Sequence, residues 1–318
     1  MECLVTGCAG FIGSHLCETL LKKGHRVHGI DCFTSYYSKE SKEKNLSPLQ
    51  SHPRFQFYPL NLAEENSQTE LNHLMRGIEW IYHLAAAPGL IASWDNFSIY
   101  NTNNVLATHR LLETAKNAPM LNRLVYASTS SVYGKYASGD EALPLKPSSP
   151  YGVTKLAAEN LCRVYYEAFD LPVVILRYFS VYGPRQRPDM GYYKFIQSIS
   201  QNEPVYLTGD GFQIRGNTFV SDCVNASIAA MDTQPGSIFN VGGGELITVR
   251  EVIRKIEQIL GKRARITQLA ERPGDQKYTG ADTLKLCRAT GWKPLVKLEE
   301  GLSQQIEWQI GKSLRQVA

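Results

Sequence analysis

The chain has 318 residues, of which 43% are hydrophobic and 20% charged, and its mean hydropathy is −0.25. This length allows two domains and excludes a mini-protein that needs disulfide bonds or a metal ion to fold. The composition excludes a mainly disordered chain. Subtracting 30 acidic from 34 basic side chains gives a net charge of +4. Because the Lys and Arg residues are scattered, we expect no nucleic-acid partner, and the basic cluster at residues 22–26 fits a solvated helix end and turn.

Cysteine usage and hydropathy indicate the cellular environment. The seven cysteines are an odd number without a C-x-x-C pair, so the sequence predicts free thiols, no disulfide framework and no metal site. Residues 1–5 lack the pattern of a secretion signal, and no run of 18 apolar residues follows. We therefore expect a cytoplasmic protein that has no membrane partner.

Short apolar segments alternate with stretches of helical periodicity. The first apolar segment leads through a glycine turn into a helical pattern over residues 14–23, and the second ends at Asp31, which completes a βαβ unit. The predicted strands are residues 3–5, 26–30, 55–58, 80–84, 123–128, 173–177 and 237–241. Such alternation predicts an α/β fold, a doubly wound parallel sheet of the Rossmann type with helices on both faces.

From about Pro184 onward, the predicted helices and strands are shorter and the sequence is richer in Gly, Pro and Arg. We assign residues 1–180 and 217–243 to a dinucleotide-binding domain. Residues 181–216 and 244–318 are assigned to a smaller C-terminal lobe that binds the substrate.

Glycines at positions 7, 10 and 13 lie where the first strand turns into the first helix. There the backbone can approach a pyrophosphate, and helix N–H groups can point at it. Gly7, Gly10 and Gly13 alone could serve a plain turn, and Asp31 could simply cap a strand end. Together they predict a dinucleotide site in which Asp31 binds the adenosine ribose hydroxyls and repels a 2′-phosphate, so NAD is favoured over NADP.

A second group of residues predicts proton transfer. Tyr151 and Lys155 are four positions apart, on one face of a helix, and Thr129 follows an apolar strand whose carboxyl end faces ligands in open α/β sheets. A Lys ammonium and a bound nicotinamide cation both lower the pKa of a phenol, so we expect Tyr151 to act as a base and Thr129 to align the reacting hydroxyl. The alternative is a surface tyrosine beside a solvated lysine.

The motifs TGCAGFIGSH, HLAAAPG, STSSVYG, SPYGVTKLAAE, LRYFSVYGPRQRPDM and ERPGDQ span nearly the whole chain. With them the sequence resembles the extended short-chain dehydrogenase/reductases that act on nucleotide sugars, and within that family most closely the UDP-glucuronate 4-epimerases. The resemblance implies tightly bound NAD that is regenerated in each turnover, a UDP-sugar substrate bound by the C-terminal lobe, and catalysis by Thr129, Tyr151 and Lys155. The implied NAD contacts are Gly7, Gly10, Phe11, Ile12, Gly13, Asp31, Asn61, Leu62, Leu84, Ala85, Ala86, Tyr151 and Lys155.

Two serines separate this chain from several relatives. Dehydratases that it resembles carry an Asp-Glu pair where this chain has Ser130 and Ser131, and decarboxylases carry a Glu at the second position. Serines cannot supply that acid–base chemistry at neutral pH. Simple oxidation and reduction at carbon 4 remain, and we expect Ser130, Ser131, Ser180 and Arg187 to hold a substrate carboxylate. Ordinary turn hydroxyls and an arginine bonded to carbonyls are the alternatives.

The resemblance places Arg215 and Arg272 at the UDP diphosphate, with surface ion pairs as the alternative. Relatives usually read Arg-Asp-Phe-Thr-Tyr where this chain has residues 215–219 as Arg-Gly-Asn-Thr-Phe, which weakens the analogy there. Asn61 replaces an acid that contacts the adenine amino group, although an amide oxygen can accept the same hydrogen bond. His83 and Trp94 are assigned no chemical role.

The sequence therefore predicts an NAD-dependent isomerase that inverts carbon 4 of a UDP-hexuronic acid through a 4-keto intermediate. A UDP-glucose or UDP-N-acetylglucosamine 4-epimerase is the first alternative, followed by a UDP-glucuronate decarboxylase, a nucleotide-sugar 4-ketoreductase and an idle NAD-binding regulator. Helices near residues 103–117 and 151–169 resemble those through which relatives dimerise, so we expect a homodimer.

Overall fold

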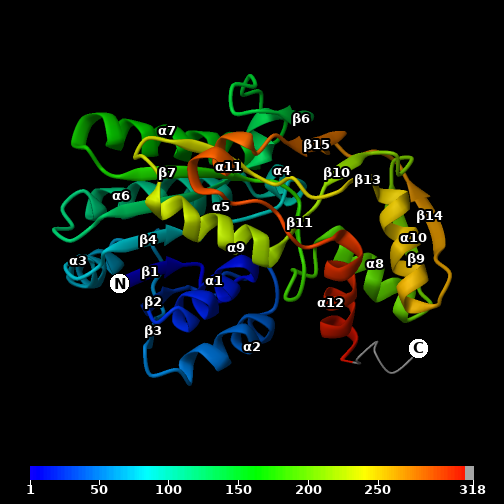
Figure 1. Cartoon of the computed structure of the whole chain (residues 1–318), viewed down its shortest axis with the longest axis horizontal. Helices are drawn as coiled ribbons and strands as arrows, with labels where there is room; N and C mark the ends of the chain where they lie inside the picture. The colour runs from blue at the N-terminus through cyan, green and yellow to red at the C-terminus, as the bar shows by residue number, and fades with distance from the viewer. Residues whose placement is uncertain (312–318) are drawn as a thin grey trace.

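The computed structural model describes residues 1–311, which form a large α/β layer structure with a smaller lobe at one end (Figure 1). The large part holds a seven-stranded sheet in the order β12-β7-β5-β4-β1-β2-β3, with every neighbouring pair parallel. Its strands are β1 (Glu2–Thr6), β2 (Arg26–Ile30), β3 (Phe55–Tyr58), β4 (Trp80–His83), β5 (Arg123–Thr129), β7 (Val173–Tyr178) and β12 (Ile238–Val241). The predicted doubly wound parallel sheet is confirmed, and each predicted strand is present within about two residues of its expected bounds.

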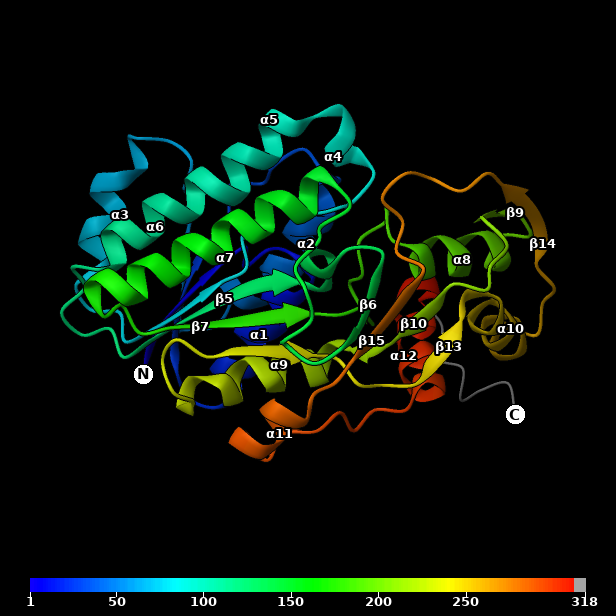
Figure 2. The same cartoon turned by 90° about the horizontal axis from the view of Figure 1, so that it is seen from above.

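Helices cover both faces of this sheet (Figure 2). Apolar side chains alternate between the two faces along a strand, so that in β1 Cys3 and Val5 enter one core while Leu4 enters the other. The first core is covered by α1 (Phe11–Lys22), α2 (Lys39–Gln50) and α9 (Val220–Ala229), and the second by α3 (Ser67–Met75), α6 (Ala107–Ala115) and α7 (Pro150–Phe169). Shorter segments are α4 (Ala92–Asp95), α5 (Phe97–Tyr100), the π-helical η1 (Asn101–Leu106), and the 3₁₀ turns η2 (Ser130–Tyr133) and η3 (Ala230–Asp232).

The smaller lobe packs its helices around two small sheets. One sheet has the order β13-β10-β15-β6, the other pairs β14 with β9, and β8 pairs with β11 between the two parts. The strands are β6 (Tyr136–Gly139), β8 (Val181–Tyr182), β9 (Pro204–Thr208), β10 (Ile214–Gly216), β11 (Thr218–Phe219), β13 (Leu246–Thr248), β14 (Arg265–Leu269) and β15 (Tyr278–Ala281). The helices are α8 (Gly191–Ser200), α10 (Val249–Leu260), α11 (Leu284–Thr290) and α12 (Leu298–Ile310).

Two elements lie across the predicted division into domains. β6 belongs to the first predicted segment in sequence but pairs in parallel with β15 of the lobe, which satisfies backbone groups on both strands. Conversely, α11 belongs to the second predicted segment but packs against β12 at the edge of the large sheet. Each structural part therefore contains an element from the sequence segment that was assigned to the other part.

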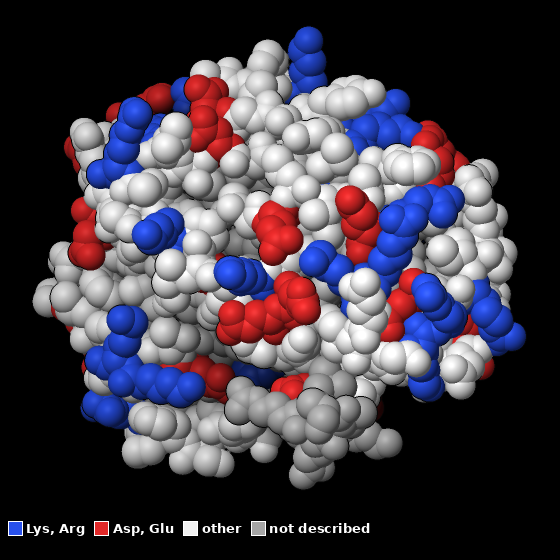
Figure 3. All heavy atoms as spheres, turned by 45° about the vertical axis from the view of Figure 1, so that its right-hand side comes forward, with Lys and Arg blue, Asp and Glu red and all other residues white. Residues whose placement is uncertain are grey.

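Charged side chains of both signs are mixed on the face of the molecule that Figure 3 draws. On the face drawn in Figure 3, Lys and Arg lie among Asp and Glu and do not gather into one patch. Within residues 1–311, no helix is both long and apolar enough to cross a membrane. The same residues contain no His, Cys, Asp and Glu group suited to a metal ion, and all seven cysteines are free thiols.

Candidate functional site

The glycine turn after β1 closes tightly enough that side chains are excluded from it. Gly7 has a φ of +74°, and a Cβ there would lie 2.9 Å from the backbone nitrogen of Ala85 after β4. A Cβ on Gly13 would lie 2.1 Å from the carbonyl oxygen of Gly7. No side chain caps the N-terminus of α1 at Gly10, so its first N–H groups face the crevice between β1 and β4. This cradle suits a pyrophosphate.

Asp31 is held at the mouth of that crevice. Its Oδ2 accepts a hydrogen bond from the Ala9 N–H at 3.2 Å, and its Oδ1 accepts one from the Phe33 N–H at 2.9 Å. Both bonds fix the orientation of the carboxylate while it still lines the crevice. The position therefore fits a partner with two neighbouring hydroxyls, as predicted for the adenosine ribose.

Most of the predicted cofactor contacts lie together. The crevice lies at the carboxyl ends of the parallel strands, at the point where the strand order reverses, and this is where open α/β sheets bind ligands. The predicted residues that line it are Gly7, Gly10, Phe11, Ile12, Gly13, Asp31, Leu62, Leu84, Ala85, Ala86, Tyr151 and Lys155. The residues present, a turn whose glycines have no room for a Cβ and a fixed carboxylate, fit NAD.

Asn61 is the predicted contact that the structure does not place in this crevice. It lines an adjoining hollow instead, together with Cys32 and Leu60. Its Oδ1 accepts a hydrogen bond from the Ala63 N–H at 3.1 Å, and its amide nitrogen donates to Glu64 at 2.8 Å. The amide that we expected to meet the adenine is thus engaged in a local turn of its own.

The start of α7 positions the predicted proton-transfer residues. Ser149 caps the helix by accepting a hydrogen bond from the Gly152 N–H at 3.1 Å, and Pro150 follows as the first helical residue. Tyr151 and Lys155 then face the crevice from successive turns. Thr129 ends β5, and its hydroxyl is close enough to Tyr151 to lower the pKa of the tyrosine, while Lys155 shares the lining of the crevice with Tyr151.

The electrostatics of these residues differ from the sequence-based expectation. Burial raises the pKa of Tyr151 above its ordinary value, and the hydrogen bond with Thr129 and the positive charge of Arg187 lower it only in part. Burial also lowers the pKa of Lys155 to about 7. Among the protein groups, the positive charge that lowers the pKa of Tyr151 belongs to Arg187. That the Lys155 ammonium and a bound nicotinamide cation together lower it further stays a prediction.

Ser130 and Ser131 lie beside Thr129 in the buried turn η2. The Ser130 hydroxyl donates a 3.5 Å hydrogen bond to Oε1 of Gln276, and the hydroxyl of Thr129 donates to that of Ser131 at 3.2 Å. Both side chains are more than 90% buried, at 4% and 6% exposure. The turn lies against the start of α7, where a Cβ on Gly152 would be 2.7 Å from the Ser131 carbonyl oxygen, and no carboxylate occupies the two serine positions.

Ser180 and Arg187 come from the segment that follows β7. Ser180 shares a hydrogen bond of 3.3 Å with the hydroxyl of Thr279. Arg187 lines the crevice, and it makes a two-pronged ion pair with Asp189, at 2.9 Å from Nε to Oδ1 and 3.0 Å from Nη2 to Oδ2. The cation is thus placed as predicted, but part of its donor capacity is already engaged.

The two arginines expected at the diphosphate differ in their surroundings. Arg272 lines a second hollow in the lobe and pairs with Asp275 at 3.2 Å. Arg215 does not line this hollow, because its guanidinium donates to the carbonyls of Ile214 at 2.9 Å and Gln276 at 2.8 Å. For Arg215 the geometry matches an arginine that satisfies backbone oxygens.

Three functional candidates were missed by sequence reasoning. Tyr36 lines the crevice together with Arg187. The Arg187 guanidinium lies 5.7 Å from the centre of the Tyr36 ring, and the Tyr36 hydroxyl donates a hydrogen bond to Asp189 at 3.4 Å. Gln276 joins the serine turn to the second hollow by donating to the carbonyls of Ser130 and Gly134 at 3.3 and 2.9 Å. Asp189 and Gln276 both stand inside quoted motifs, so their motifs could have singled them out, whereas nothing local marks Tyr36.

The fold and the crevice define a dinucleotide-binding α/β protein in which Tyr151 and Lys155 belong to the lining of the crevice. The family model described as GDP-mannose 4,6 dehydratase matches residues 4–305, and the chain belongs to this family of extended short-chain dehydrogenase/reductases. Ser130 and Ser131 show that family membership does not carry the acid–base pair of a dehydratase into this chain.

Similar proteins cover the chain almost completely. It is 43% identical to the uncharacterized UDP-glucose epimerase YtcB of Bacillus subtilis, over 97% of this chain and 98% of that protein. It is 36% identical to the UDP-glucuronate 4-epimerase of Thermodesulfobacterium geofontis, over 96% and 95%. The crystal structure of UDP-glucuronic acid 4-epimerase from Bacillus cereus with UDP-glucuronic acid and NAD superposes with a TM-score of 0.93 at 41% identity, with all of both chains covered.

Proposed function

We propose that the protein is an NAD-dependent UDP-glucuronate 4-epimerase, an isomerase that interconverts UDP-glucuronate and UDP-galacturonate. One observation carries this proposal: Tyr151 and the cation of Arg187 line one crevice, and the buried turn that follows the crevice residue Ser128 in the chain holds the neutral Ser130 and Ser131. The full-length similarity to epimerases, one of them solved with UDP-glucuronic acid and NAD, supports it.

The residues divide the work as follows. When bound, NAD accepts hydrogen from carbon 4 and later returns it. Tyr151 takes the proton of the 4-hydroxyl and gives it back, while Thr129 holds that hydroxyl in line. Gly7, Gly13 and Asp31 would hold the pyrophosphate and the ribose, so the cofactor stays bound between turnovers.

The carboxylate must be held without being lost, because a 4-keto glucuronate is a β-keto acid. Ser130 and Ser131 offer short neutral hydroxyls, and no acid stands at their positions to help carbon dioxide leave. Arg187 supplies positive charge, with Ser180 from the same segment as a further donor. Arg272 and Arg215 remain our candidates for the diphosphate, with Arg272 favoured because it lines the second hollow.

A second candidate, UDP-glucose 4-epimerase, is favoured by one observation. The Arg187 guanidinium is paired in two-pronged fashion with Asp189, which neutralises part of the charge that a carboxylate would need. The relative YtcB is also named for UDP-glucose. The two candidates differ only in the group on carbon 5, so a direct substrate comparison separates them.

The test incubates purified protein, with no cofactor added, with UDP-glucuronate, UDP-glucose or UDP-xylose and follows the sugars by proton NMR. Interconversion of the glucuronate and galacturonate forms alone is the expected result. Turnover of UDP-glucose alone would establish the second candidate, and formation of a pentose nucleotide would establish a decarboxylase. A requirement for added NADH would instead indicate a ketoreductase.

We also propose a homodimer that works in the cytoplasm, where NAD and reduced thiols prevail. The support is that η1 and α7 carry exposed apolar side chains, namely Leu106, Val153, Val164 and Phe169, which are 38–54% exposed. A second copy of the chain would bury them as a four-helix bundle. Light scattering after gel filtration is expected to give twice the chain mass, and Val164→Glu is expected to give monomers.

A further inference from the structure

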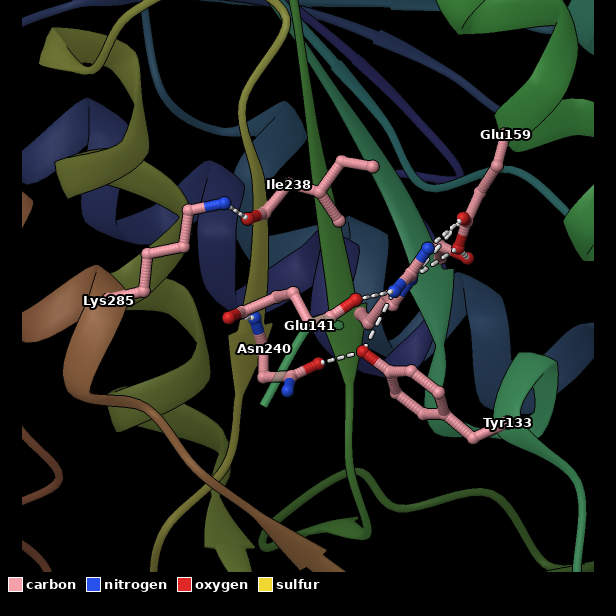
Figure 4. A network of polar contacts seen from close by, with 8 residues as sticks. Tyr133, Glu141, Glu159, Ile238, Asn240 and Lys285 are labelled. Atoms are coloured by element: carbon pink, nitrogen blue, oxygen red, sulfur yellow. Dashed lines mark hydrogen bonds and ion pairs between the residues drawn. The ribbon is translucent and has the colours of Figure 1, made fainter. Parts of the chain in front are cut away.

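A buried ion pair lies directly behind the proton-transfer residues. Glu159 of α7 and Arg177 of β7 are both about 2% exposed, and they meet through three contacts: Arg177 Nε lies 3.1 and 3.2 Å from the two carboxylate oxygens, and Nη2 lies 2.7 Å from Oε2. Figure 4 shows Glu159 entering this network from α7 and Tyr133 entering it from η2.

Neighbouring polar groups complete the network. Arg177 Nη1 donates to the hydroxyl of Tyr133 at 2.8 Å, and that hydroxyl donates to Oδ1 of Asn240 at 2.7 Å. The backbone N–H of Asn240 donates to the carboxylate of Glu141 at 2.6 Å (Figure 4). The network thereby joins β7, α7, η2 and β12, which include the elements that carry Tyr151, Lys155, Ser130 and Ser131.

One contact reaches the reaction site itself. The Ser128 hydroxyl donates a hydrogen bond to Oε1 of Glu159, and Ser128 directly precedes Thr129 in the chain. Ser128 and Arg177 are also register partners in the sheet, so Glu159 bonds two residues that face each other across β5 and β7. Ser128 itself lines the crevice, so the Glu159 carboxylate fixes the residue from which Thr129 continues the chain.

A second effect is electrostatic, because Glu159 follows Lys155 by four residues on the same face of α7. The other titratable groups around Lys155 are His83 on β4, Tyr126 on β5, with its ring centre 4.2 Å from Nζ, and Cys162 on α7. Burial lowers the pKa of Lys155, and Cys162 and then Glu159 oppose that fall. Arg177 offsets part of the Glu159 charge through the ion pair.

Stability alone does not account for such a pair. A buried ion pair is often no more stabilising than apolar residues of similar volume, because the desolvation cost offsets the attraction. We propose that Glu159 is a positioning residue for the reaction: it fixes Thr129 through Ser128 and supplies the negative charge that keeps Lys155 an ammonium. The kinetic part of this proposal rests on the proposed epimerase function.

The first test is Glu159→Gln, which keeps the shape and removes the charge. Without the carboxylate, Lys155 loses its proton at lower pH, so the alkaline limb of the kcat/KM profile is expected to move down by about one pH unit. We expect kcat at pH 7.5 to fall about tenfold, because Thr129 loses its tether. KM for the UDP-sugar and the content of bound NAD are expected to stay near their original values. An unchanged alkaline limb would overturn the electrostatic part.

Two further variants separate position from charge. Ser128→Ala removes the hydroxyl and leaves the ion pair, so it is expected to lower kcat about tenfold with an unchanged alkaline limb. Glu159→Asp keeps the charge on a shorter side chain and is expected to restore the alkaline limb. If Glu159→Gln does not fold, these two variants decide the proposal. An unchanged kcat in Ser128→Ala would contradict it, and so would an alkaline limb of the kcat/KM profile that moves in Glu159→Asp.

The matched control is Asp222→Asn. Asp222 is also a buried carboxylate, 2% exposed, but it lies on α9, where it accepts a hydrogen bond from the Val296 N–H at 3.0 Å. This variant is expected to lose stability without moving the pH profile. An equal shift in Asp222→Asn would reduce Glu159 to a merely structural residue.

A readout that needs no turnover keeps this proposal separate from the proposed function. In protein labelled with ¹³C-lysine, the Lys155 side-chain signal, assigned by its loss in Lys155→Met, reports the protonation of Nζ directly. We expect its titration midpoint to be about one pH unit lower in Glu159→Gln than in the original protein. An unmoved midpoint would overturn the proposal, while absence of any epimerisation by the original protein would overturn only the function.

Discussion

The cofactor side and the substrate side of the crevice are built differently. On the cofactor side, the fit depends on the backbone: Gly7 and Gly13 leave no room for a side chain, and Asp31 is fixed by two backbone N–H groups. On the substrate side, the fit depends on long side chains that bond one another, such as Arg187 with Asp189. A site formed by the backbone can be recognised from a short sequence motif. A site formed by side chains depends on partners that are distant in the sequence.

The largest expected effect lies where the two sides meet. Tyr151→Phe removes the proton acceptor and keeps the ring, so we expect kcat to fall about a thousandfold while NAD stays bound. Proton NMR of the sugars measures the first quantity, and absorbance of the cofactor released on denaturation measures the second. Tyr206→Phe, at a 61% exposed tyrosine of the lobe, is the control that should change neither. Retained turnover in Tyr151→Phe would refute the assignment of the base.

The backbone-built side can be broken with one methyl group. In Gly13→Ala the new Cβ would lie 2.1 Å from the Gly7 carbonyl oxygen, so the turn must open. Overpacking of this kind costs about 1–3 kcal/mol, and we expect NAD affinity to fall about a hundredfold. Calorimetric titration of NAD measures this. Gly77→Ala, where nothing lies within 4 Å of the added methyl, should bind NAD normally. Equal affinities in the two variants would contradict a backbone-built cradle.

The side-chain-built side is tested by charge specificity. Arg187→Ala removes the cation of the crevice, and we expect kcat/KM for UDP-glucuronate to fall about thirtyfold, against about threefold for UDP-glucose. Arg185→Ala is the matched control, because Arg185 lies in the same loop but pairs with Glu18 of α1. It should affect both sugars alike. Equal losses on the two sugars in Arg187→Ala would assign its charge to the nucleotide or to Tyr151.

The smallest expected effect is on the free energy of unfolding, and it comes from a histidine in the large sheet that carries both sides of the crevice. His83 is buried at the end of β4, between the hydroxyls of Thr6 and Thr108, and burial lowers its pKa to about 3. The unfolded chain therefore binds this proton below about pH 6.5 while the folded chain does not, so stability falls as the pH falls. We expect His83 to account for a loss of about 2 kcal/mol between pH 7 and pH 5, measured by urea unfolding. His83→Gln should lack this loss, and the exposed His73→Gln should keep it.

The two sides also differ in how far the sequence could predict them. The alternation of strands and helices, the glycine turn before the first helix and the four-residue spacing of Tyr151 and Lys155 follow from local periodicity and spacing, and all of them were predicted. The partners of Arg215 and Asn61 were not, because Arg215 bonds a carbonyl 61 residues away at Gln276 and Asn61 turns back on its own loop. The burial that raises the pKa of Tyr151 was not predicted either, because a motif does not report how deeply a side chain is buried.

The pairing of β6 with β15 has a consequence for engineering. Because β6, β10, β13 and β15 come from four separate stretches of the chain, the smaller lobe has no single pair of cut points in the gene. A chimera that exchanges this lobe between relatives in one piece would leave at least one strand behind with a foreign neighbour. New substrate preferences are therefore better installed by exchanging individual loops, such as residues 184–190, than by recombining whole lobes.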